Sequence, residues 1–349
     1  MSKKVFVGLS GGVDSSVTAA LLKQRGFDVT GVYMKNWSQD LPGMICPWKQ
    51  DYQDAKRVAV ELDIQFKMYD FETEYRQLVV DYMIKEYKAG RTPNPDIMCN
   101  QEVKFKLFLD TALSGGADFI ATGHYARIKD GHLFTGLDSE KDQSYFLYRV
   151  NESALTRSLM PIGEFRKSEV RELARKFGLA TADKKDSQGI CFVGKVGIKD
   201  FLLHELGEQP YGDIVNQHGQ VIGEHDGALF YTIGQRHGLQ VGGGLPFYVT
   251  GKDMKKNIVY VTTDLQDKDL WSRELKLTSL HWINRPPSNY DKLNVRTRYR
   301  AQLVPITSIN EVGDDAMQVT LSEDIRAVTP GQSAVIYSGD EVLGGGIVV

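Results

Sequence analysis

Short apolar runs alternate with stretches of helical periodicity through about the first 200 residues, and this alternation restricts the fold more than any other feature. The apolar runs include VFVGL, DVTGVYM, IQFKMYDF and ADFIATGHY. Between or after them come SSVTAALLKQRG, DYQDAKRVAVEL, two helical stretches near residues 73–88 and 101–113, and KSEVRELARKFG. Strands that alternate with helices form parallel sheets covered by helices on both faces. The sequence therefore predicts an α/β domain built on a parallel sheet.

After about residue 205 the sequence becomes rich in turns. Segments such as NIVYVTTD, LNVRTRYRAQL, AMQVTLSED and SAVIYSG alternate apolar and polar residues, and Gly, Pro, Asn and Asp separate them. This pattern is typical of β-strands joined by turns, and 349 residues are enough for two or three domains. We expect an α/β domain over residues 1–204, a small β-rich central domain over 205–265 and a C-terminal β-barrel over 266–349.

Composition limits the class of protein. Hydrophobic residues make up 42% of the chain and charged residues 25%, which is ordinary for a globular protein, and no apolar run is long enough to span a bilayer. A predicted strand begins within a few residues of Met1 and leaves no room for a signal peptide, so we expect a cytoplasmic protein without membrane attachment. Three cysteines argue against a disulfide framework. Because the net charge is −3, any binding of nucleic acid must depend on a local basic surface.

The loop SGGVDSS, residues 10–16, lies between the first predicted strand and a helix. Such a junction attracts anions, because unpaired backbone N–H groups and the positive end of the helix dipole point out of it. The loop matches neither G-x-x-x-x-G-K-[ST] nor G-x-G-x-x-G, and so predicts a different kind of phosphate site. Its glycines allow close approach of the backbone, its serines offer hydroxyls, and Asp14 could hold Mg²⁺. The alternative is an ordinary turn whose Ser and Asp side chains cap the helix.

Residues that follow two other predicted strands could complete a pocket with this loop. Met34 follows the second strand, and Gly123 and His124 follow the strand ADFIAT. Ligands of open parallel sheets bind beyond the carboxyl ends of the strands. We therefore expect these residues to share one nucleotide site with the loop.

A second notable stretch, GRTPNPDIMCNQEVKF, contains Cys99. Pro93 and Pro95 stiffen a loop that enters a helix, so Asp96 and Cys99 should lie near the helix start. A helix N-terminus lowers the pKa of a thiol from about 8.5 toward neutrality and favours the thiolate. The alternative is that Cys99 is a small, buried hydrophobic residue.

The other two cysteines have different surroundings. Cys191 lies in KKDSQGICFVGK near Lys184, Lys185 and Lys195, and nearby cations favour a thiolate, although a buried thiol is an equal alternative. Cys46, in GMICPWKQ, has no acid, base or helix start beside it, so we expect it to be buried. The sequence contains no C-x₂-C or H-x₃₋₅-H pair, so we do not expect a zinc site. An iron–sulfur cluster held by the cysteines is a further alternative.

The segment LNVRTRYRA has the alternation of a strand with Arg296, Arg298 and Arg300 on one face. An arginine row beside a tyrosine suits a phosphate backbone and a stacked base. The alternative is a solvated face of the barrel. The cluster EKDQSY, residues 140–145, fits either solvated surface or a contact with a partner.

Together these motifs resemble the tRNA-specific 2-thiouridylase family, which replaces the C2 oxygen of the wobble uridine with sulfur in the tRNAs for lysine, glutamate and glutamine. SGGVDSS is shared with a wider superfamily of PP-loop ATP pyrophosphatases, whereas TPNPDIMCN, ATGHY, KDQSYFL and SQGICFV are more specific to thiouridylases. The resemblance covers the whole chain. It implies a PP-loop domain of the HUP type, a small central domain and a tRNA-binding β-barrel. It also implies ATP and Mg²⁺ as cofactors, tRNA as a partner, and a cysteine desulfurase or sulfur relay protein as the persulfide donor.

The resemblance also implies roles for individual residues. Cys99 would be the nucleophile and partner thiol, Cys191 the persulfide carrier that can close a disulfide with Cys99, and Asp96 the acid or base. The matching ATP-binding positions are Gly8, Leu9, Ser10, Gly11, Gly12, Val13, Asp14, Ser15, Met34 and Gly123. The target base would contact Asn94, Pro95 and Asp96. The matching tRNA-contact positions are His124, Lys141, Asp142, Gln143, Arg298, Tyr299 and Gln332.

The implied reaction begins with adenylation of the uracil O2 and loss of pyrophosphate, with the loop N–H groups stabilising the departing charge. The base must first leave its stack. Cys99 would then either attack the persulfide on Cys191 to free sulfide or resolve the product as a disulfide. Two rival functions share the first loop. A PP-loop ligase that uses ammonia would not require Cys99 or Cys191, and a non-catalytic RNA-binding protein would keep ATP as a structural ligand.

Overall fold

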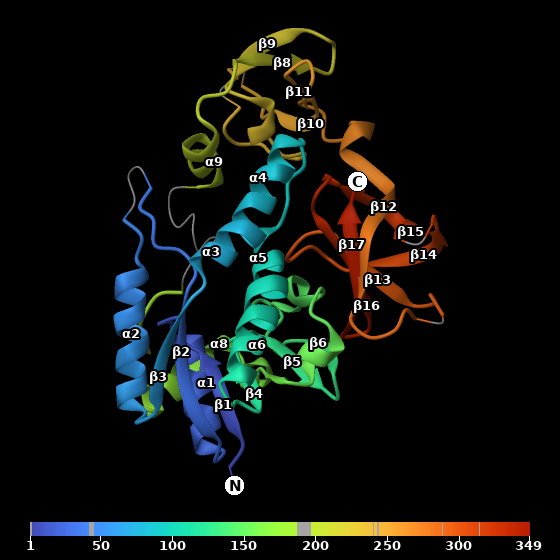
Figure 1. Cartoon of the computed structure of the whole chain (residues 1–349). Helices are drawn as coiled ribbons and strands as arrows, with labels where there is room; N and C mark the ends of the chain where they lie inside the picture. Colours follow the sequence, from blue (N-terminus) through green and yellow to red (C-terminus); the bar gives the residue numbers. More distant parts are fainter. Residues whose placement is uncertain are drawn as a thin grey trace.

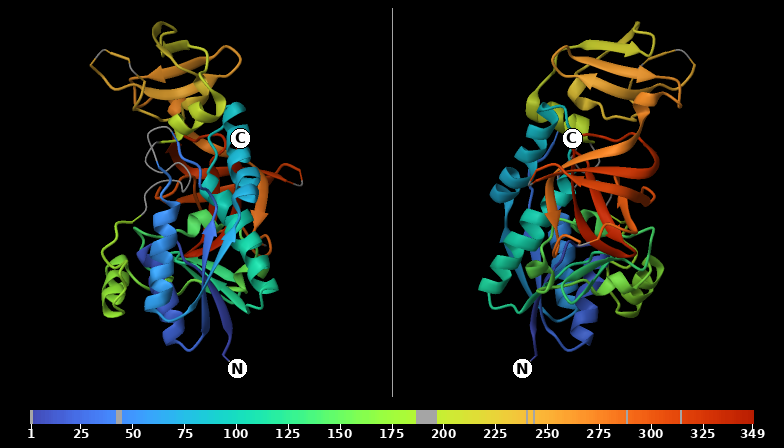
Figure 2. Two further views of the ribbon diagram at one scale, coloured as in Figure 1. Left: turned by 60° about the vertical axis from the view of Figure 1, so that its left-hand side comes forward. Right: turned by 90° about the vertical axis from the view of Figure 1, so that its right-hand side faces the viewer.

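The computed structural model describes residues 2–41, 45–186, 197–239, 241–242, 244–287, 289–313 and 315–349. Its three parts are an N-terminal α/β part, a small central β-sheet at the opposite end of the molecule, and a C-terminal barrel beside the helices that run between them (Figure 1). Two further views show the barrel between the two ends of the molecule (Figure 2). No helix in the described ranges is long and apolar enough to cross a membrane.

The N-terminal part is built on a five-stranded parallel sheet in the order β3-β2-β1-β4-β7. The strands are β1 Lys4–Gly8, β2 Asp28–Lys35, β3 Gln65–Asp70, β4 Phe119–Ala121 and β7 Ser158–Leu159. Side chains alternate between the two faces of a strand, and in β1 Val5 and Val7 belong to one buried core whereas Phe6 belongs to another. Both faces are therefore covered, which confirms the predicted parallel sheet.

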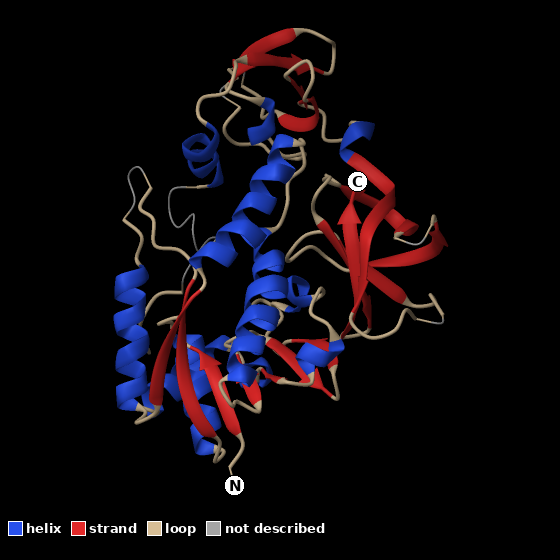
Figure 3. Ribbon diagram, viewed as in Figure 1, coloured by secondary structure: helices blue, strands red, loops and turns tan. Residues whose placement is uncertain are grey.

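Helices form the two covering layers (Figure 3). Buried residues of α1 Val13–Gln24, α2 Trp48–Glu61 and α8 Lys167–Lys176 form one core with Val5 and Val7. The other core includes residues of two helical runs. The first run is α3 Glu72–Tyr75, η1 Arg76–Val80 and α4 Asp81–Lys88, and the second is α5 Pro95–Met98, η2 Cys99–Leu107 and α6 Phe108–Ser114. The helices expected near residues 73–88 and 101–113 are confirmed.

Shorter elements complete the N-terminal part. They are β5 Ala126–Lys129, β6 His132–Thr135, η3 Ser144–Leu147, α7 Glu152–Leu155 and η4 Pro161–Glu164. The β5–β6 hairpin does not join the parallel sheet. It pairs with the last strand of the barrel, where Phe134 and Leu133 lie opposite Glu341 and Val342. Residues far apart in the sequence thus share one sheet.

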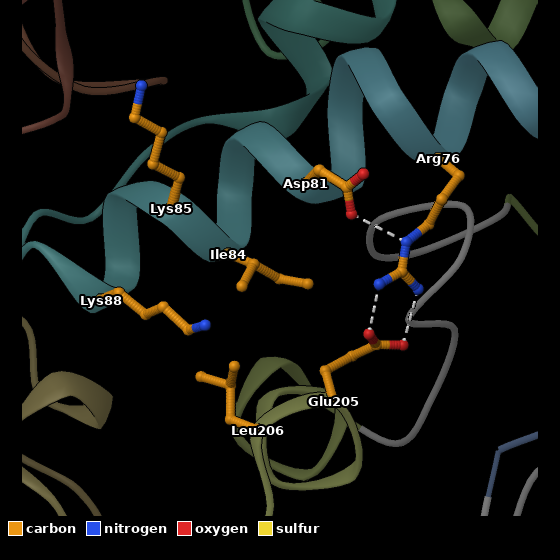
Figure 4. A pocket seen from close by; sticks show the side chains of 7 residues that line it. All are labelled: Arg76, Asp81, Ile84, Lys85, Lys88, Glu205 and Leu206. Carbon is orange, nitrogen blue, oxygen red and sulfur yellow. Dashed lines mark hydrogen bonds and ion pairs between the residues drawn. The ribbon is translucent and has the colours of Figure 1, made fainter.

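The central part contains α9 Ile198–Leu206 and a four-stranded sheet in the order β10-β11-β8-β9. Its elements are β8 Gly212–Asn216, β9 Val221–His225, η5 Ala228–Phe230, β10 Tyr248–Asp253 and β11 Ile258–Thr262. Glu205 of α9 accepts two hydrogen bonds from the Arg76 guanidinium, of 2.9 and 2.6 Å (Figure 4). A hollow of ≈ 440 Å³ lies beside this ion pair, and Ile84, Lys85, Lys88 and Leu206 also line it. The ion pair fastens α9 to the first helical run.

The C-terminal part is a closed six-stranded barrel in the order β12-β15-β14-β13-β16-β17, and β17 pairs with β12 to close it. Its elements are η6 Lys268–Leu270, β12 Trp271–Trp282, β13 Leu293–Arg296, β14 Val304–Glu311, β15 Ala316–Arg326, β16 Ser333–Ser338 and β17 Glu341–Val348. Alternate residues such as Leu275, Leu277, Val319 and Ile336 form its core. The predicted barrel is therefore confirmed.

The prediction of an arginine row on one strand is wrong. β13 ends at Arg296, after which the chain turns, and Arg300 has a φ of 63° in the left-handed region. Arg298 donates hydrogen bonds of 2.9 Å to the backbone oxygens of both Ile233 and Ala327. Alternation along the segment could not reveal these distant acceptors, which hold Arg298 between the barrel and the central part.

Candidate active site

The SGGVDSS loop lies at the carboxyl end of β1, and α1 begins directly after Gly12. Its serines bond within the loop: the Ser10 N–H donates to Ser15 Oγ at 3.1 Å, and Ser16 Oγ donates to the Gly12 carbonyl at 2.7 Å. Gly11 has a φ of 75°, and a Cβ at this position would lie 2.5 Å from the Asp51 carbonyl oxygen of α2. Only glycine fits both the backbone conformation and this close approach.

Two further strands bring their carboxyl ends to the same loop. A Cβ on Gly8 would lie 2.9 Å from Cε of Met34, and a Cβ on Gly123 would lie 2.7 Å from the backbone nitrogen of Ser15. The structure therefore brings together the residues predicted to share a nucleotide site. This edge of a parallel sheet is where ligands of such sheets bind.

Asp14 accepts hydrogen bonds from a lysine that was not predicted from the sequence. Lys167 Nζ donates to the two carboxylate oxygens of Asp14 at 2.7 and 2.9 Å, and the Tyr125 hydroxyl donates to Oδ1 at 2.8 Å. Burial, followed by the Asp14 charge, raises the pKa of Tyr125 and keeps its hydroxyl protonated. Lys167 is the first residue of α8. The signal that could have identified it is the helix KSEVRELARKFG, because its start follows β7 at the same edge of the sheet.

Asp186 connects Lys167 to other cations. Its carboxylate lies 2.9 Å from Nζ of Lys167, 2.9 Å from Nζ of Lys141 and 2.8 Å from Nη2 of Arg171. Burial raises the pKa of Asp186, but hydrogen bonds from Lys167 and Lys141 outweigh it and lower the pKa to about 2. The carboxylate is therefore charged at neutral pH. Cys191 and the rest of SQGICFV lie outside the described residues.

Residues 92–96, here called the base loop, lead into α5 and include its first two residues. The Asn94 side chain caps this helix by accepting a hydrogen bond of 3.1 Å from the Asp96 N–H, and Pro95 occupies the first helical position. Burial raises the pKa of the Asp96 carboxyl, and the charge of Lys104 partly offsets this. Cys99 begins η2, one turn further along, and its side chain is buried. Cys46 is also buried, as expected, and burial raises the pKa of its thiol.

His124 lies beside Lys104, a second residue that sequence reasoning missed. Lys104 Nζ is 3.5 Å from Nε2 of His124, and Thr122 Oγ1 is 2.8 Å from Nδ1. Burial and then the Lys104 charge hold the pKa of His124 well below its usual value. An ammonium group can only donate, so the neutral ring accepts at Nε2 and carries its proton at Nδ1, facing Thr122. Lys104 follows Cys99 in the motif NQEVKF, which was the available signal.

Several residues expected to contact tRNA form contacts inside the protein. Gln143 Oε1 accepts from the Tyr125 N–H at 3.0 Å. Asp142 is 5% exposed and accepts from backbone N–H groups of Gly136 and Ser144, and it also pairs with Arg296 at 3.3 Å. These bonds fix the KDQSYFL segment against the barrel.

The remaining candidates lie where the barrel meets the N-terminal part. The Tyr299 and Phe146 rings are in contact, with centroids 4.5 Å apart. Gln332 Nε2 donates to the backbone oxygen of Thr92 at 2.7 Å. Contact of any of these residues with tRNA stays a prediction.

The fold and this arrangement define a HUP-domain protein with two appended β-rich domains. Three family models match in succession: the tRNA methyl transferase HUP domain over residues 3–195, the tRNA methyl transferase PRC-barrel domain over 199–263, and the aminomethyltransferase beta-barrel domain over 272–348.

Curated relatives narrow the class. The chain is 48% identical over 359 residues to the tRNA-specific 2-thiouridylase MnmA of Idiomarina loihiensis, covering 99% of this chain and 96% of the relative. It is 46% identical over 352 residues to the protein of the same name from Bacillus subtilis, covering 99% of this chain and 94% of that one. The chain belongs to the tRNA-specific 2-thiouridylase family.

Similarity to solved structures is weaker. A 4-thiouridine synthetase–RNA complex with bound ATP is 21% identical with a TM-score of 0.38, covering 53% of this chain and 43% of that chain. An NMN synthetase from Francisella tularensis is 18% identical with a TM-score of 0.34, covering 53% of this chain and 66% of that chain. Structural similarity this weak gives no information about the site.

Proposed function

We propose that this protein is a tRNA-uridine 2-sulfurtransferase that converts the wobble uridine of the lysine, glutamate and glutamine tRNAs into 2-thiouridine, with release of AMP and pyrophosphate. The observation that carries the proposal is identity of 46–48% over 99% of the chain to proteins named tRNA-specific 2-thiouridylase. The placement of the base loop and Cys99 in the same part as the SGGVDSS loop supports it. We assign the protein to the cytoplasm, where its tRNA substrates are used.

ATP would bind along Gly8–Ser15 with Met34 and Gly123 beside it, so that loop N–H groups face the phosphates. Lys167 would stabilise charge that develops on the departing pyrophosphate. Asp14 offers the carboxylate oxygens that Mg²⁺ prefers, but both now accept from Lys167. Asp14 is therefore the residue that would hold Mg²⁺, and the bound ion would neutralise charge on the phosphates.

The base loop would hold the uracil. The uracil C2 is a poor electrophile, and its oxygen is a poor leaving group until it is adenylated. Because burial raises the pKa of Asp96, this carboxyl is suited to hold a proton near the ring and exchange it with the base. Asn94 and Pro95 would position the base from the same loop.

Sulfur would arrive on Cys191 as a persulfide from a cysteine desulfurase or a sulfur relay protein. In one route the Cys99 thiolate attacks the Cys191 sulfur, forming a Cys99–Cys191 disulfide and releasing hydrosulfide, which attacks C2 and displaces AMP. In the other route the persulfide attacks C2 and displaces AMP, and the Cys99 thiolate then attacks the Cys191 sulfur, which releases the thiouridine and forms the Cys99–Cys191 disulfide. Either route ends with a disulfide that a two-electron reductant must reduce.

The deciding experiment incubates the protein with unmodified glutamate tRNA, Mg·ATP and a cysteine desulfurase with cysteine, then measures 2-thiouridine by mass spectrometry after digestion of the RNA. Cys99→Ser and Cys191→Ser run alongside, and a parallel set receives free sulfide, which can bypass the carrier. We expect thiouridine from the wild type and none from Cys191→Ser with the desulfurase.

Other outcomes identify the rivals. AMP release with ammonia in place of sulfur, without thiouridine, would indicate a PP-loop ligase. Binding of tRNA without release of pyrophosphate would indicate a non-catalytic RNA-binding protein. A brown protein after anaerobic purification would indicate an iron–sulfur cluster.

A further inference from the structure

A turn of the barrel touches the chain directly before the target-base residues. This turn, residues 329–333, is here called the barrel turn. The Thr92 N–H donates to the Pro330 carbonyl at 2.8 Å, and Gln332 Nε2 donates to the Thr92 carbonyl at 2.7 Å. Both polar groups of the Thr92 backbone are therefore held by residues more than 200 positions away in the sequence.

Gly331 allows the barrel turn to lie close to the backbone of Thr92. Its φ is 92°, and a Cβ at this position would lie 2.8 Å from the Thr92 nitrogen and 2.9 Å from the Arg91 Cβ. A larger residue would push the barrel turn away from the base loop. The turn is shaped to fit this backbone, with no space between them for a side chain.

Thr92 also contacts the central part, and Arg91 beside it is bonded to α4. Thr92 Oγ1 lies 3.2 Å from Oγ1 of Thr232 in the central part. The next residue toward the N-terminus, Arg91, is held by Glu86 of α4 through Nε at 2.5 Å and Nη2 at 2.6 Å. Thr92 is 9% exposed. The start of the base loop is thus fixed at a junction of all three parts.

The same turn reaches the segment that packs against the Cys99 helix. The Tyr145 hydroxyl donates to the Ser333 carbonyl at 2.8 Å, and the Tyr148 hydroxyl lies 3.0 Å from Ser333 Oγ. Asn100, which follows Cys99, donates to the Phe146 carbonyl at 3.1 Å. The barrel turn therefore contacts the base loop directly and the Cys99 helix through one intermediate segment.

We propose that the barrel turn is a positioning device for the reaction: Gln332, through its hydrogen bond to the Thr92 carbonyl, holds the base loop in the geometry that receives the uracil. This gives Gln332 a role beyond a tRNA contact, because one of its two amide N–H groups already donates to the protein backbone. The inference rests on the proposed function, since it concerns the loop that would hold the base.

The test uses Gln332→Met, which keeps the length of the side chain and removes the donor, and Gln332→Lys, which keeps a donor of similar reach. Hydrogen exchange of the peptide over residues 91–98 measures the base loop directly. Filter binding gives the Kd for unmodified glutamate tRNA, and single-turnover thiolation at saturating tRNA gives the rate. Gln217→Met is the matched control, because the Gln217 amide bonds Thr263 within the central part.

In Gln332→Met we expect faster exchange over residues 91–98, a Kd within about twofold of the wild type, and a thiolation rate lower by about three- to tenfold, as for one hydrogen bond of ordinary net strength. Gln332→Lys should keep the exchange and most of the rate, and Gln217→Met should change none of them. Unchanged exchange in Gln332→Met, or a weaker Kd with an unchanged rate at saturation, would overturn the proposal and leave Gln332 a tRNA contact. The wild type could exchange slowly over residues 91–98 and Gln332→Met rapidly, while the wild type makes no thiouridine. In that case the proposed function would be wrong, but the role of Gln332 in holding the base loop would be supported.

Discussion

At the candidate site, neighbouring residues determine the charge state and the hydrogen-bond partners of individual side chains. Lys167 shares its ammonium between the carboxylates of Asp14 and Asp186, so the loop aspartate has a counterion before any nucleotide binds. His124 is buried beside an ammonium and stays neutral. Sequence reasoning named Asp14 and His124 but neither cation beside them, because the fold decides which acceptor a lysine side chain reaches.

Replacing Lys167 by Met should lower the rate of pyrophosphate release from ATP by about 10²-fold, which is typical of removing one donor from a developing anion. The substitution removes the cation that pairs with Asp14 and that, in the proposed reaction, would stabilise the departing pyrophosphate, while the apolar length of the side chain is kept. Release of pyrophosphate in the presence of unmodified tRNA is the measurement. Lys176→Met, on the exposed face of the same helix, is the control and should leave the rate unchanged. An unchanged rate in Lys167→Met would contradict the role proposed for this lysine.

The histidines predict how stability depends on pH. Burial lowers the pKa values of His124, His225 and His281, so below about pH 6.5 the unfolded chain binds more protons than the folded protein. The free energy of unfolding therefore falls as the pH drops below that value, by at most about 1.4 kcal/mol per pH unit for each histidine. Urea unfolding at pH 7.5 and 5.5 should show this loss in the wild type and a smaller loss in His124→Gln, since glutamine does not titrate. Equal losses in both proteins would show that His124 does not contribute.

Among the elements, α9 depends on others for its position. It is nine residues long, which is too short to be stable alone. Phe201 and Leu202 bury its apolar face, and Glu205 forms the paired hydrogen bonds with Arg76. Glu205 has a side chain only 11% exposed, so the ion pair is partly removed from water and stronger than a surface pair.

Glu205→Gln should loosen α9 because it removes the charge from this pair and leaves Arg76 with Asp81 alone. We expect faster hydrogen exchange over residues 198–206 and a loss of about 1–2 kcal/mol in the free energy of unfolding, which is typical of a hydrogen bond to a charged group. Asp183→Asn is a suitable control, because its ion pair with Arg175 is far more exposed. Equal exchange over α9 in the wild type and Glu205→Gln would show that apolar packing alone holds the helix.

At the scale of the whole molecule, the three parts are held together by buried polar contacts as well as by apolar packing. Arg298 Nη2 donates to the carbonyls of Ile233 and Ala327 and, at 2.6 Å, to Thr329 Oγ1. The β5–β6 hairpin extends the barrel sheet from the N-terminal part. One core also includes buried residues from all three parts, such as Phe108, Val249 and Tyr337.

Arg298→Met should weaken the junction between the barrel and the central part. Three oxygen acceptors lose their charged donor, so we expect a loss of about 2–3 kcal/mol, typical of hydrogen bonds to a charged group, and earlier unfolding of the central part. Differential scanning calorimetry would show this as a lower or divided transition. Arg273→Met is the control, because its pair with Asp324 is about half exposed and should contribute less than about 1 kcal/mol. A single transition at the wild-type temperature would contradict the assignment.

Features that depend on the local order of residues along the chain could be predicted from the sequence. Alternating and helical patterns predicted the parallel sheet, its helices and the β-rich remainder. Pro93 and Pro95 predicted the loop that enters the Cys99 helix, because prolines and apolar faces act through neighbouring residues. Other features became visible only in the folded protein: the pairing of Lys167 with Asp14, the neutral His124 beside Lys104, the turn that separates the arginines after Arg296, and the hydrogen bond of Gln332 to Thr92. These depend on which acceptor a long side chain meets across the fold. Burial then sets the strength of each contact. No pattern in neighbouring residues specifies either the partner of a long side chain or its burial.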